Sequence, residues 1–547
     1  MTPNRTKYHL PDYRRHVLLS MFLGVTILPV GASPTDSLKS SRNLPLSVNR
    51  HRHWPASPTP SVANSRTFPR WAGFVELGGL ASSSGLTPFW LQTNQYGVVP
   101  KETPTGLIRL NASRTYRIDS LEKRRKTDLG YGVELAGQVG QVNHLLVVEA
   151  YLKARWGVVE LFAGRRRQRV GLAESALSSG SYIWSGNTLP LPQVQIGLPN
   201  YVPIGFTNGW VALKGFIAHG WFGNDGYVQG SYLHQKAIYL RLGRPQARVQ
   251  FYSAFTHVAQ WGGYAPFLEQ DPTSSFKGQL ATSWDAFVNV LLPLKTDALK
   301  DRTKFTTFDQ NRVGDHRGTA EVAVDVRLAQ GTIRLYQQHF YDVGRKLYNL
   351  RNIEDGLYGL RYVRNERRGF LREVVLELFN SGNQGVLQFG RSLGGEPENY
   401  FLNGQYPASW SYRGRTIGTP FMTQSSDASA ELPRLPFSGY TTSNQLIEGV
   451  HGINNNRVWA LYGGLAGRLG AHWRVESKVS FSRNYGTFTA PFPAGTNQWS
   501  ALGSLIHAGP TGTQVIVSLA YDQGRLLASP QQVGGYVGLR KQWGHPL

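Results

Sequence analysis

Alternation of apolar and polar residues is the feature of this sequence that most constrains its fold. In LLVVEAYLKARW, residues 145–156, every second residue from Leu146 to Trp156 is apolar, and the interleaved set ends in charged residues. AEVAVDVRL (residues 320–328) and WRVESKVSFS (residues 473–482) repeat the pattern. Because successive side chains of a β-strand point to opposite faces, each segment is predicted to be a strand with one apolar and one polar face.

The length and number of these segments indicate a closed barrel in a membrane. They run to about 9–12 residues, the length that crosses a bilayer when tilted, whereas strands of soluble proteins have about 5–6. Roughly 18 segments occur, an even number that suits a closed barrel. The sequence therefore predicts an all-β fold, a transmembrane antiparallel β-barrel of roughly 18 strands. The other predicted strands are 74–80, 130–140, 158–165, 208–217, 237–243, 248–256, 285–292, 332–340, 357–363, 371–379, 385–391, 457–466, 499–507, 513–521 and 533–543.

Aromatic residues stand at the ends of several predicted strands. Trp156, Trp473 and Phe481 are examples, and Trp543 ends the last segment close to the C-terminus. Outer-membrane barrels carry such aromatic girdles at both membrane interfaces.

The N-terminus is predicted to direct export. A basic stretch that ends at Arg15 precedes a short apolar run at residues 17–30, and small residues follow. This order is typical of a secretory signal peptide, which we assign to residues 1–32. Residues 33–70 are rich in Ser and Pro and are predicted to be a disordered or extended leader, followed by the barrel at 71–547. The expected location is the bacterial outer membrane.

Two long segments lack alternation. Residues near 175–207 and 392–447 are rich in Gly, Ser, Pro, Asn, Trp and Tyr. Unstructured connections of this length are usually functional loops. In a barrel they are expected to be extracellular loops or plugs folded into the lumen.

The sequence offers no catalytic or metal-binding motif. It contains no cysteine, which excludes disulfides, thiolate catalysis and cysteine-ligated metals. Serine hydrolase, zinc protease and Walker motifs are absent, and the 14 histidines are scattered. We therefore expect no enzyme, no catalytic residue, no metal and no cofactor.

The charge predicts an anionic partner, since the formal net charge is +24. Behind an export signal, this favours acidic polysaccharide or lipopolysaccharide phosphates over nucleic acid. Arginine binds carboxylates and phosphates bidentately, and aromatic rings offer flat apolar faces to sugars. In the alternative, the arginines meet lipopolysaccharide or pair with acids inside the lumen. The candidate ligand contacts are Arg165, Arg166, Arg167, Trp184, Trp410, Tyr412, Arg413 and Arg415.

Several stretches resemble one known family. They include TPFWLQTNQYGVVP (87–100), GRRRQRVGLAESALSSGSYIWSGNTLPLPQV (164–194), WSYRGRTIGTPF (410–421) and NNNRV (454–458). Together they resemble the Wzi family of capsule-assembly proteins, in its Bacteroidetes-type branch. The resemblance implies an outer-membrane barrel that acts as a surface lectin for capsular polysaccharide and is not an enzyme. The family's periplasmic helical bundle has no counterpart, because residues 33–70 are too short and too rich in proline.

The stretch at residues 87–100 combines large aromatics with amides. Placed on a strand near the first hairpin, Trp90 and Tyr96 are expected to anchor an interface, with the amides satisfying one another in the lumen. The alternative is that Trp90 and Asn94 bind sugar.

The expected function is to bind and anchor capsular or other surface polysaccharide, a lectin-like role in capsule assembly. The expected partners are that polysaccharide and outer-membrane lipid or lipopolysaccharide, with a single chain as the functional unit and no nucleic acid. Two alternatives stay open, an anion-selective porin and a barrel enzyme that acts on lipid A or a glycan.

Overall fold

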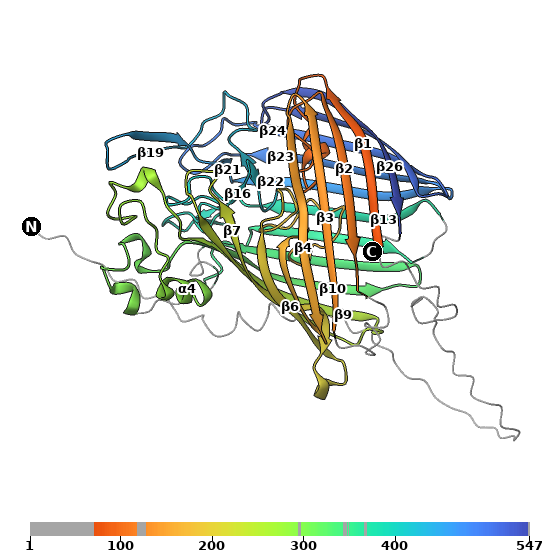
Figure 1. The fold of residues 1–547 in the computed structure, drawn as a ribbon, viewed down its shortest axis with the longest axis horizontal. Helices are drawn as coiled ribbons and strands as arrows, with labels where there is room; N and C mark the ends of the chain where they lie inside the picture. The colour runs from red at the N-terminus through yellow and green to blue at the C-terminus, as the bar shows by residue number, and fades with distance from the viewer. Residues whose placement is uncertain are drawn as a thin grey trace, which may run out of the picture. The chain divides into compact units, whose positions relative to one another are not determined.

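The protein folds as a closed antiparallel β-barrel (Figure 1). The computed structural model describes residues 71–116, 127–293, 297–342, 347, 349–365 and 369–544. The predicted signal peptide and leader lie outside these residues. Eighteen strands form one sheet, each antiparallel to its neighbours, and the first strand pairs with the last, with Leu77 opposite Leu539. This confirms the predicted fold class.

The barrel strands follow one another around the wall in chain order. They are β1 (Trp71–Ser82), β2 (Thr105–Arg114), β3 (Thr127–Gly140), β4 (His144–Trp156), β5 (Val159–Arg165), β6 (Gln193–Pro203), β7 (Val211–Gly223), β8 (Ser231–Leu242), β9 (Val249–Trp261), β10 (Asp315–Arg327), β11 (Gly331–Tyr341), β12 (Gly356–Arg364), β13 (Leu371–Asn380), β22 (Val458–Leu469), β23 (Trp473–Asn484), β24 (Asn497–Ala508), β25 (Thr513–Gly524) and β26 (Gln531–Trp543).

The remaining elements are short. The helices are α2 (Phe89–Gln92), α4 (Trp284–Leu291), η1 (Gly205–Thr207), η2 (Pro266–Leu268), η3 (Asp297–Lys300) and η4 (Phe308–Gln310). The strands form four separate pairs: β14 (Leu387–Gln388) with β15 (Arg391–Ser392), β16 (Ser411–Tyr412) with β17 (Arg415–Thr416), β18 (Thr423–Gln424) with β21 (Ile453–Asn455), and β19 (Pro436–Tyr440) with β20 (Leu446–Val450). In the part of the chain that the structure describes, no helix is long and apolar enough to cross a membrane.

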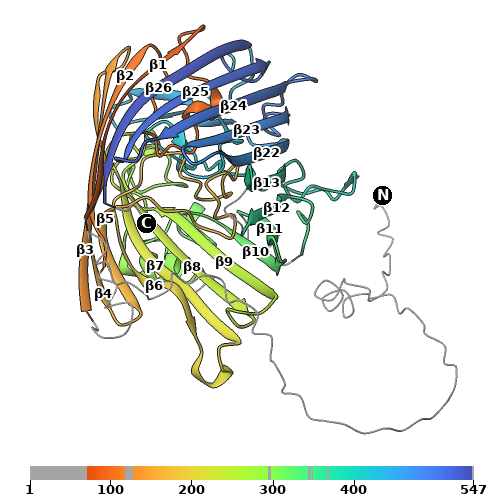
Figure 2. The ribbon, with the colours of Figure 1, turned by 90° about the vertical axis from the view of Figure 1, so that its right-hand side faces the viewer.

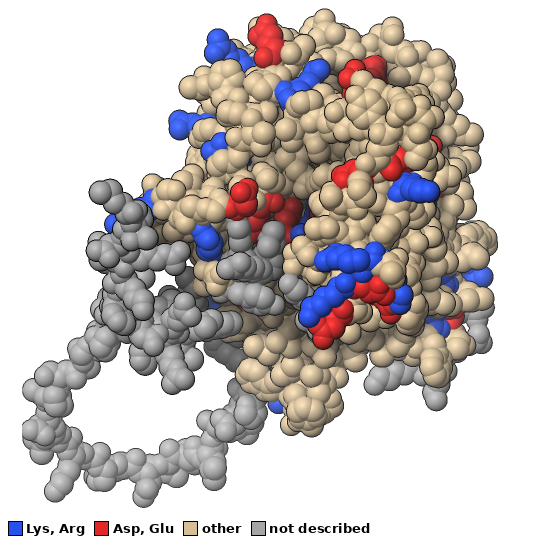
Figure 3. Space-filling view, turned by 90° about the vertical axis from the view of Figure 1, so that its left-hand side faces the viewer, with Lys and Arg blue, Asp and Glu red and all other residues tan. Residues whose placement is uncertain are grey.

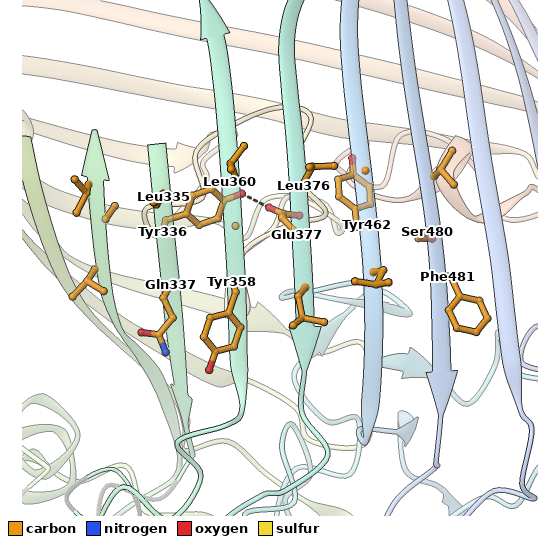
Figure 4. A pocket seen from close by; sticks show the side chains of 18 of the residues that line it. Leu335, Tyr336, Gln337, Tyr358, Leu360, Leu376, Glu377, Tyr462, Ser480 and Phe481 are labelled. Carbon is orange, nitrogen blue, oxygen red and sulfur yellow. Dashed lines mark hydrogen bonds between the residues drawn. The ribbon is translucent and has the colours of Figure 1, made fainter. Parts of the chain in front are cut away.

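The predicted alternation places apolar side chains on the outside of the wall. Leu335, Leu376 and Val479 are exposed on the outer face, whereas Tyr336 and Glu377, on the same strands, are buried inside. Figure 4 shows the two sets on strands β11 to β23, with the inward pair joined by a hydrogen bond of 2.5 Å. The outward set lines an open apolar depression of about 920 Å³ on the wall. A soluble protein rarely exposes so continuous an apolar surface.

A β-bulge changes the phase of the alternation in β4. The register shifts between Glu134 and Leu135 on the partner strand β3. Leu152 and Trp156 face outward as predicted, but Val148 is fully buried and Leu145 is 75% exposed. The prediction of one unbroken apolar face for residues 145–156 is therefore wrong, because a bulge inserts one extra residue on one side of the pair.

Two predicted strands are not part of the wall, and two wall strands were not predicted. Residues 285–291 of the segment predicted at 285–292 belong to α4, since a short apolar run fits a helix or a strand equally well. Residues 385–391 contain only the two-residue strand β14 and the start of β15. Strand β2 was missed, and so was β6, which lies within the loop expected near 175–207 and contains Pro199. The predicted count of roughly 18 is right because these errors offset each other.

The two ends of the barrel differ in their connections. At one end, which we call the short-turn end, the links include residues 157–158, 328–330 and 470–472. At the other, the long-loop end, they include residues 166–192 and 381–457. Outer-membrane barrels have short periplasmic turns and longer extracellular loops.

Exposed tryptophans mark the short-turn end, as expected of an interfacial girdle. Those at or next to strand ends there are Trp71, Trp156, Trp210, Trp473 and Trp543. Phe481 lies towards the long-loop end of β23, where its ring packs 4.7 Å from that of Trp499.

The main core of the molecule lies inside the barrel. Three segments, residues 86–102, 166–192 and 399–427, fold into the ring of strands, and we call them together the plug (Figure 2). Buried apolar residues of the plug pack in one cluster with inward side chains of nearly every wall strand. The core is thus built from loops and wall together.

Candidate functional site

The centre of the plug is a stretch without regular secondary structure. Residues 177–191 are buried without interruption. Tyr182 donates a hydrogen bond of 2.9 Å from its Oη to Asp342 Oδ1, and its ring stacks 4.0 Å from that of Phe340. Ser178 Oγ donates to Glu377 Oε1 at 2.6 Å. These bonds to the wall satisfy buried polar groups and hold the stretch across the lumen.

The third plug segment is bonded to the same stretch. Trp410, which is fully buried, donates from Nε1 to the carbonyl of Ile183 at 2.8 Å. Ser185 N donates to the carbonyl of Ile417 at 3.0 Å, and Thr419 N donates to that of Tyr182 at the same distance. Two loops far apart in sequence therefore form one body inside the barrel.

The first plug segment contains the aromatic and amide stretch at residues 87–100. Trp90 is fully buried in the lumen and donates from Nε1 to Ser480 Oγ at 2.9 Å. Asn94 Nδ2 donates to the carbonyl of Ser179 at 2.8 Å. The expected strand is instead the short helix α2 and a turn, and Trp90 is buried inside the barrel and not on its membrane-facing surface. Asn94 is buried as expected, but Gln95 is exposed, and the amides bond to backbone carbonyls and not to one another.

A polar cleft opens where the plug meets the long-loop end. Its volume is about 140 Å³, and it is lined from the first plug segment, from residues 415–427 and from the β25–β26 loop. The lining combines half-buried apolar side chains such as Phe89 with amides such as Gln92, hydroxyls and charges. A concave site with a few convergent polar groups is typical of ligand-binding pockets.

The charges in the cleft balance. Lys101 forms an ion pair with Asp427 and donates to the carbonyl of Gly414 at 2.8 Å. Burial lowers the pKa of Lys101, and the carboxylate of Asp427 opposes that shift. Arg415 donates from Nη1 to Gln92 Oε1 at 2.8 Å, and burial lowers its pKa also. With Glu102 as the second acid, two cations face two carboxylates.

Three buried polar atoms of the cleft have no hydrogen-bond partner within the described residues. They are the Oγ1 atoms of Thr87 and Thr93 and Nε2 of Gln424. Their residues are almost completely buried, with exposed fractions of 1%, 6% and 6%. Buried polar atoms are almost always bonded to protein or water, so the unpartnered atoms of these cleft-lining residues are a place for a water or a ligand hydroxyl group.

Comparisons with known proteins yield a match in structure only. No family model matches the sequence, and no curated protein matches it. Among solved structures, the chain is similar to Wzi, an outer membrane protein involved in group 1 capsule assembly in Escherichia coli, whose description is a carbohydrate binding β-barrel. The TM-score is 0.51 at 11% identity, and the match covers 86% of this chain and 85% of that one. What the two proteins share is the fold.

A second group of similar structures consists of mutants of the porin of Rh. blastica. One of them has a TM-score of 0.32 and 9% identity, and the match covers 86% of this chain and 99% of that one. At that score the likeness carries no argument about this protein.

The three consecutive candidate arginines lie inside the lumen and not at a rim. Arg165 Nη2 donates to Tyr412 Oη at 2.9 Å. Arg166 forms an ion pair of 2.6 Å with Glu160, and Arg167 one of 2.7 Å with Glu134. The ion pairs of Arg166 and Arg167 match the alternative in which arginines pair with acids of the lumen.

The other candidates divide between the interior and the surface. Trp184, Trp410 and Tyr412 are buried in the plug. Arg413 is exposed at the long-loop end and pairs with Asp225 at 3.0 Å, while Arg415 lines the cleft. The structure thus brings the candidates to one body, and their role as ligand contacts stays a prediction.

The cleft also contains residues that the sequence did not single out. Lys101 directly follows the stretch at 87–100, and this proximity was a usable signal. Gln424 and Asp427 lie in a polar segment with no distinguishing pattern. Their approach to Lys101 depends on contacts more than 300 positions apart in the chain.

The surface of the long-loop end is mostly uncharged. Figure 3 views the side on which α4 and the β19–β20 hairpin lie, and basic residues are scattered there among acidic ones. In the described part of the chain, no group of three or more His, Cys, Asp and Glu side chains is arranged to hold a metal ion.

Proposed function

We propose that this protein is an outer-membrane β-barrel that binds and anchors capsular or other surface polysaccharide, a lectin-like role in capsule assembly, and that it is not an enzyme. The polar cleft carries the proposal, because it combines a partly exposed aromatic ring, paired charges and three unpartnered buried polar atoms. The likeness in fold to a carbohydrate-binding barrel agrees with it.

The membrane location follows from the outer wall. Apolar side chains cover it, and tryptophans mark the short-turn end. By the usual orientation, the short turns face the periplasm and the long loops face outward. Export would use the signal peptide predicted at residues 1–32, and the cleft would then face the cell exterior. Outer-membrane lipid or lipopolysaccharide is the expected surrounding partner of a single chain.

The charge balance of the cleft favours neutral sugar units or sparsely charged ones. Lys101 and Arg415 are both engaged by the protein itself, so neither is a free anchor for a carboxylate. Each contact with a sugar is expected to be weak. Retention along a repeating polymer would come from many barrels binding one chain at the same time.

The plug argues against the porin alternative. Residues 177–191 cross the lumen fully buried, and two further plug segments pack against them. An open, anion-selective pore needs a continuous aqueous path. Planar-bilayer recordings of the purified protein are expected to show no steady current.

The cleft is tested by replacing residues that carry its unpartnered polar atoms with apolar residues of similar side-chain volume. Thr87→Val and Gln424→Leu, alone and combined, are expected to reduce polysaccharide retention by whole cells and binding of isolated polysaccharide to the purified barrel. Thr511→Val and Gln330→Leu are matched controls, since both residues are exposed in turns at the short-turn end. Unchanged binding by the double variant, with heat-modifiable gel mobility preserved, would refute the cleft as the site.

A further inference from the structure

The helix α4 lies on the outside of the barrel wall. Phe251 and Phe255 of β9 are exposed on its outer face, and Ala259 and Trp261 continue the same alternate set. Ala286 and Val290 of α4 pack against this pair in a buried cluster. The part of the loop at residues 262–314 that carries α4 therefore packs on the outer face of the wall near the long-loop end.

Three polar contacts fix α4 in this position. Ser283 caps the N-terminus, where its Oγ accepts a hydrogen bond from Ala286 N at 3.2 Å. Asn289 Oδ1 accepts one from Val313 N at 2.9 Å. Lys236 of β8 donates to the carbonyl of Leu291, at the C-terminal end of the helix. The helix is thus bonded to the wall strand and to its own loop.

The side of α4 that faces away from the wall is apolar. Trp284 is 74% exposed, Val288 is 38% exposed and Leu292, directly after the helix, is 56% exposed. Residues four apart lie above one another on a helix, so the three form one stripe. Exposing such side chains to water costs about 25 cal/mol per Å² of apolar surface. Nothing in the described residues covers the stripe.

The stripe continues the apolar surface of the wall. Lys236, which contacts the end of α4, is two residues from Ile238 on the same strand face, and Ile238 pairs with Phe255 of β9. Both of these side chains are exposed. A tryptophan next to such a surface is typical of the membrane interface, where its ring lies at the headgroup level. The occupant that fits both surfaces is the acyl region of one lipid leaflet.

We propose that α4 is an interfacial helix whose stripe of Trp284, Val288 and Leu292 inserts among the acyl chains of the outer leaflet. Amphipathic helices bind in this plane with the apolar face buried below the headgroups. The inference rests on the proposed membrane location. The anchored loop also carries η2, where Phe267 packs 5.2 Å from Phe437 of the β19–β20 hairpin. The helix therefore ties this surface hairpin to the membrane.

The absence of cysteine makes the test direct, because one introduced cysteine is the only labelling site. Three variants are each labelled with an environment-sensitive fluorophore: Val288→Cys, Val479→Cys and Gln445→Cys. They are placed in phosphatidylcholine vesicles. The vesicles contain a nitroxide lipid with its spin label near the headgroup, which quenches fluorophores at that depth. Val479 is exposed on the outer wall and Gln445 in the hairpin turn. Intact barrels are selected by heat-modifiable mobility.

Quenching at position 288 is expected to exceed that at position 445 by about three-fold or more, with blue-shifted emission. Quenching at 479 but not at 288 would overturn the role of α4 and leave the membrane location intact. Quenching at neither position would overturn both. A fourth outcome is that unlabelled Val288→Cys oxidises to a disulfide-linked dimer in vesicles and that position 288 shows no quenching. This outcome would assign the stripe to a second copy of the chain and refute the lipid contact.

Discussion

Two long loops leave the same end of the barrel and fold to opposite sides of its wall. Residues 166–192 enter the lumen, while the part of the loop at residues 262–314 that carries α4 covers the outer surface. The inward loop is rich in serine and glycine, and its groups bond to carboxylates such as Glu377 and Asp342. The outward loop instead offers apolar side chains on α4.

This difference shows that each face of the wall selects its own kind of loop. The inner face carries fixed charges that need donors, since a buried carboxylate without hydrogen bonds is costly. The outer face is apolar, so a loop that covers it needs only apolar side chains. The same wall residues that establish the barrel thus also determine the direction in which each loop folds.

The comparison predicts the largest effect for a tryptophan of the plug. Trp410→Ala removes a fully buried ring and its hydrogen bond to Ile183. The free energy of unfolding is expected to fall by about 3–5 kcal/mol, as for other buried aromatic residues. Urea titration followed by gel mobility measures it. A loss below about 1 kcal/mol would mean that the plug contributes little to stability.

The second effect concerns pH and the attachment of the third plug segment. Asp355 accepts hydrogen bonds from Asn383 N at 3.0 Å, Gln384 N at 2.7 Å and Tyr400 Oη at 2.8 Å. Burial raises the pKa of Asp355 to about 6, and these hydrogen bonds only partly oppose the shift. The folded protein therefore binds this proton more tightly than the unfolded chain does.

Protonated Asp355 therefore contributes about 2–3 kcal/mol to the free energy of unfolding below about pH 4, and this contribution is lost as pH rises through about 6. Unfolding free energies between pH 4 and 7 measure the change. Asp355→Asn, which stays neutral at every pH, is expected to remove this part of the pH dependence. A pH profile identical to that of the wild type would contradict the assignment.

The third effect is smaller and concerns the outward loop. Ser283→Ala removes the side-chain cap of α4, which is expected to cost about 1 kcal/mol of local stability. Hydrogen exchange of the α4 amides should accelerate, while exchange in residues 177–191 stays unchanged. Faster exchange in both loops would show that the two regions are coupled.

The smallest change in stability is expected for Trp284→Ala, which also removes a tryptophan and so is matched to Trp410→Ala. Trp284→Ala removes an exposed tryptophan of α4, and in detergent it is expected to change the free energy of unfolding by about 0.5 kcal/mol or less. The contrast with Trp410→Ala separates a ring that packs inside from one that faces outward. Equal losses for the two variants would break the comparison.

The sequence predicted the wall well because the wall obeys a local rule. The alternation in residues 320–328 and 473–482 depends only on neighbouring positions, so a single strand reveals its two faces. Strand β6 escaped because Pro199 and Gly197 interrupt its pattern. The bulge at Val148 was invisible, since it depends on pairing with the partner strand.

The site was less predictable because it depends on distant contacts. The sequence identified Arg165 and Tyr412 as binding candidates by residue type, yet these two side chains bond to each other across 247 positions. Residues 87–100 were recognised as unusual, and they do line the cleft, but their path into the lumen has no local signal. Gln424 and Asp427 carry no signal in sequence at all.

The seam between β1 and β26 has a consequence for the order of assembly. Glu76 and Tyr536, which form a hydrogen bond across it, are 460 positions apart. Closing so long a loop is slow, since its entropy must be lost before the contacts form. The ring cannot close until the final strand has been synthesised, and the plug segments are tethered at both ends to strands of that ring. Filling the lumen and sealing the seam are therefore two parts of one late kinetic event.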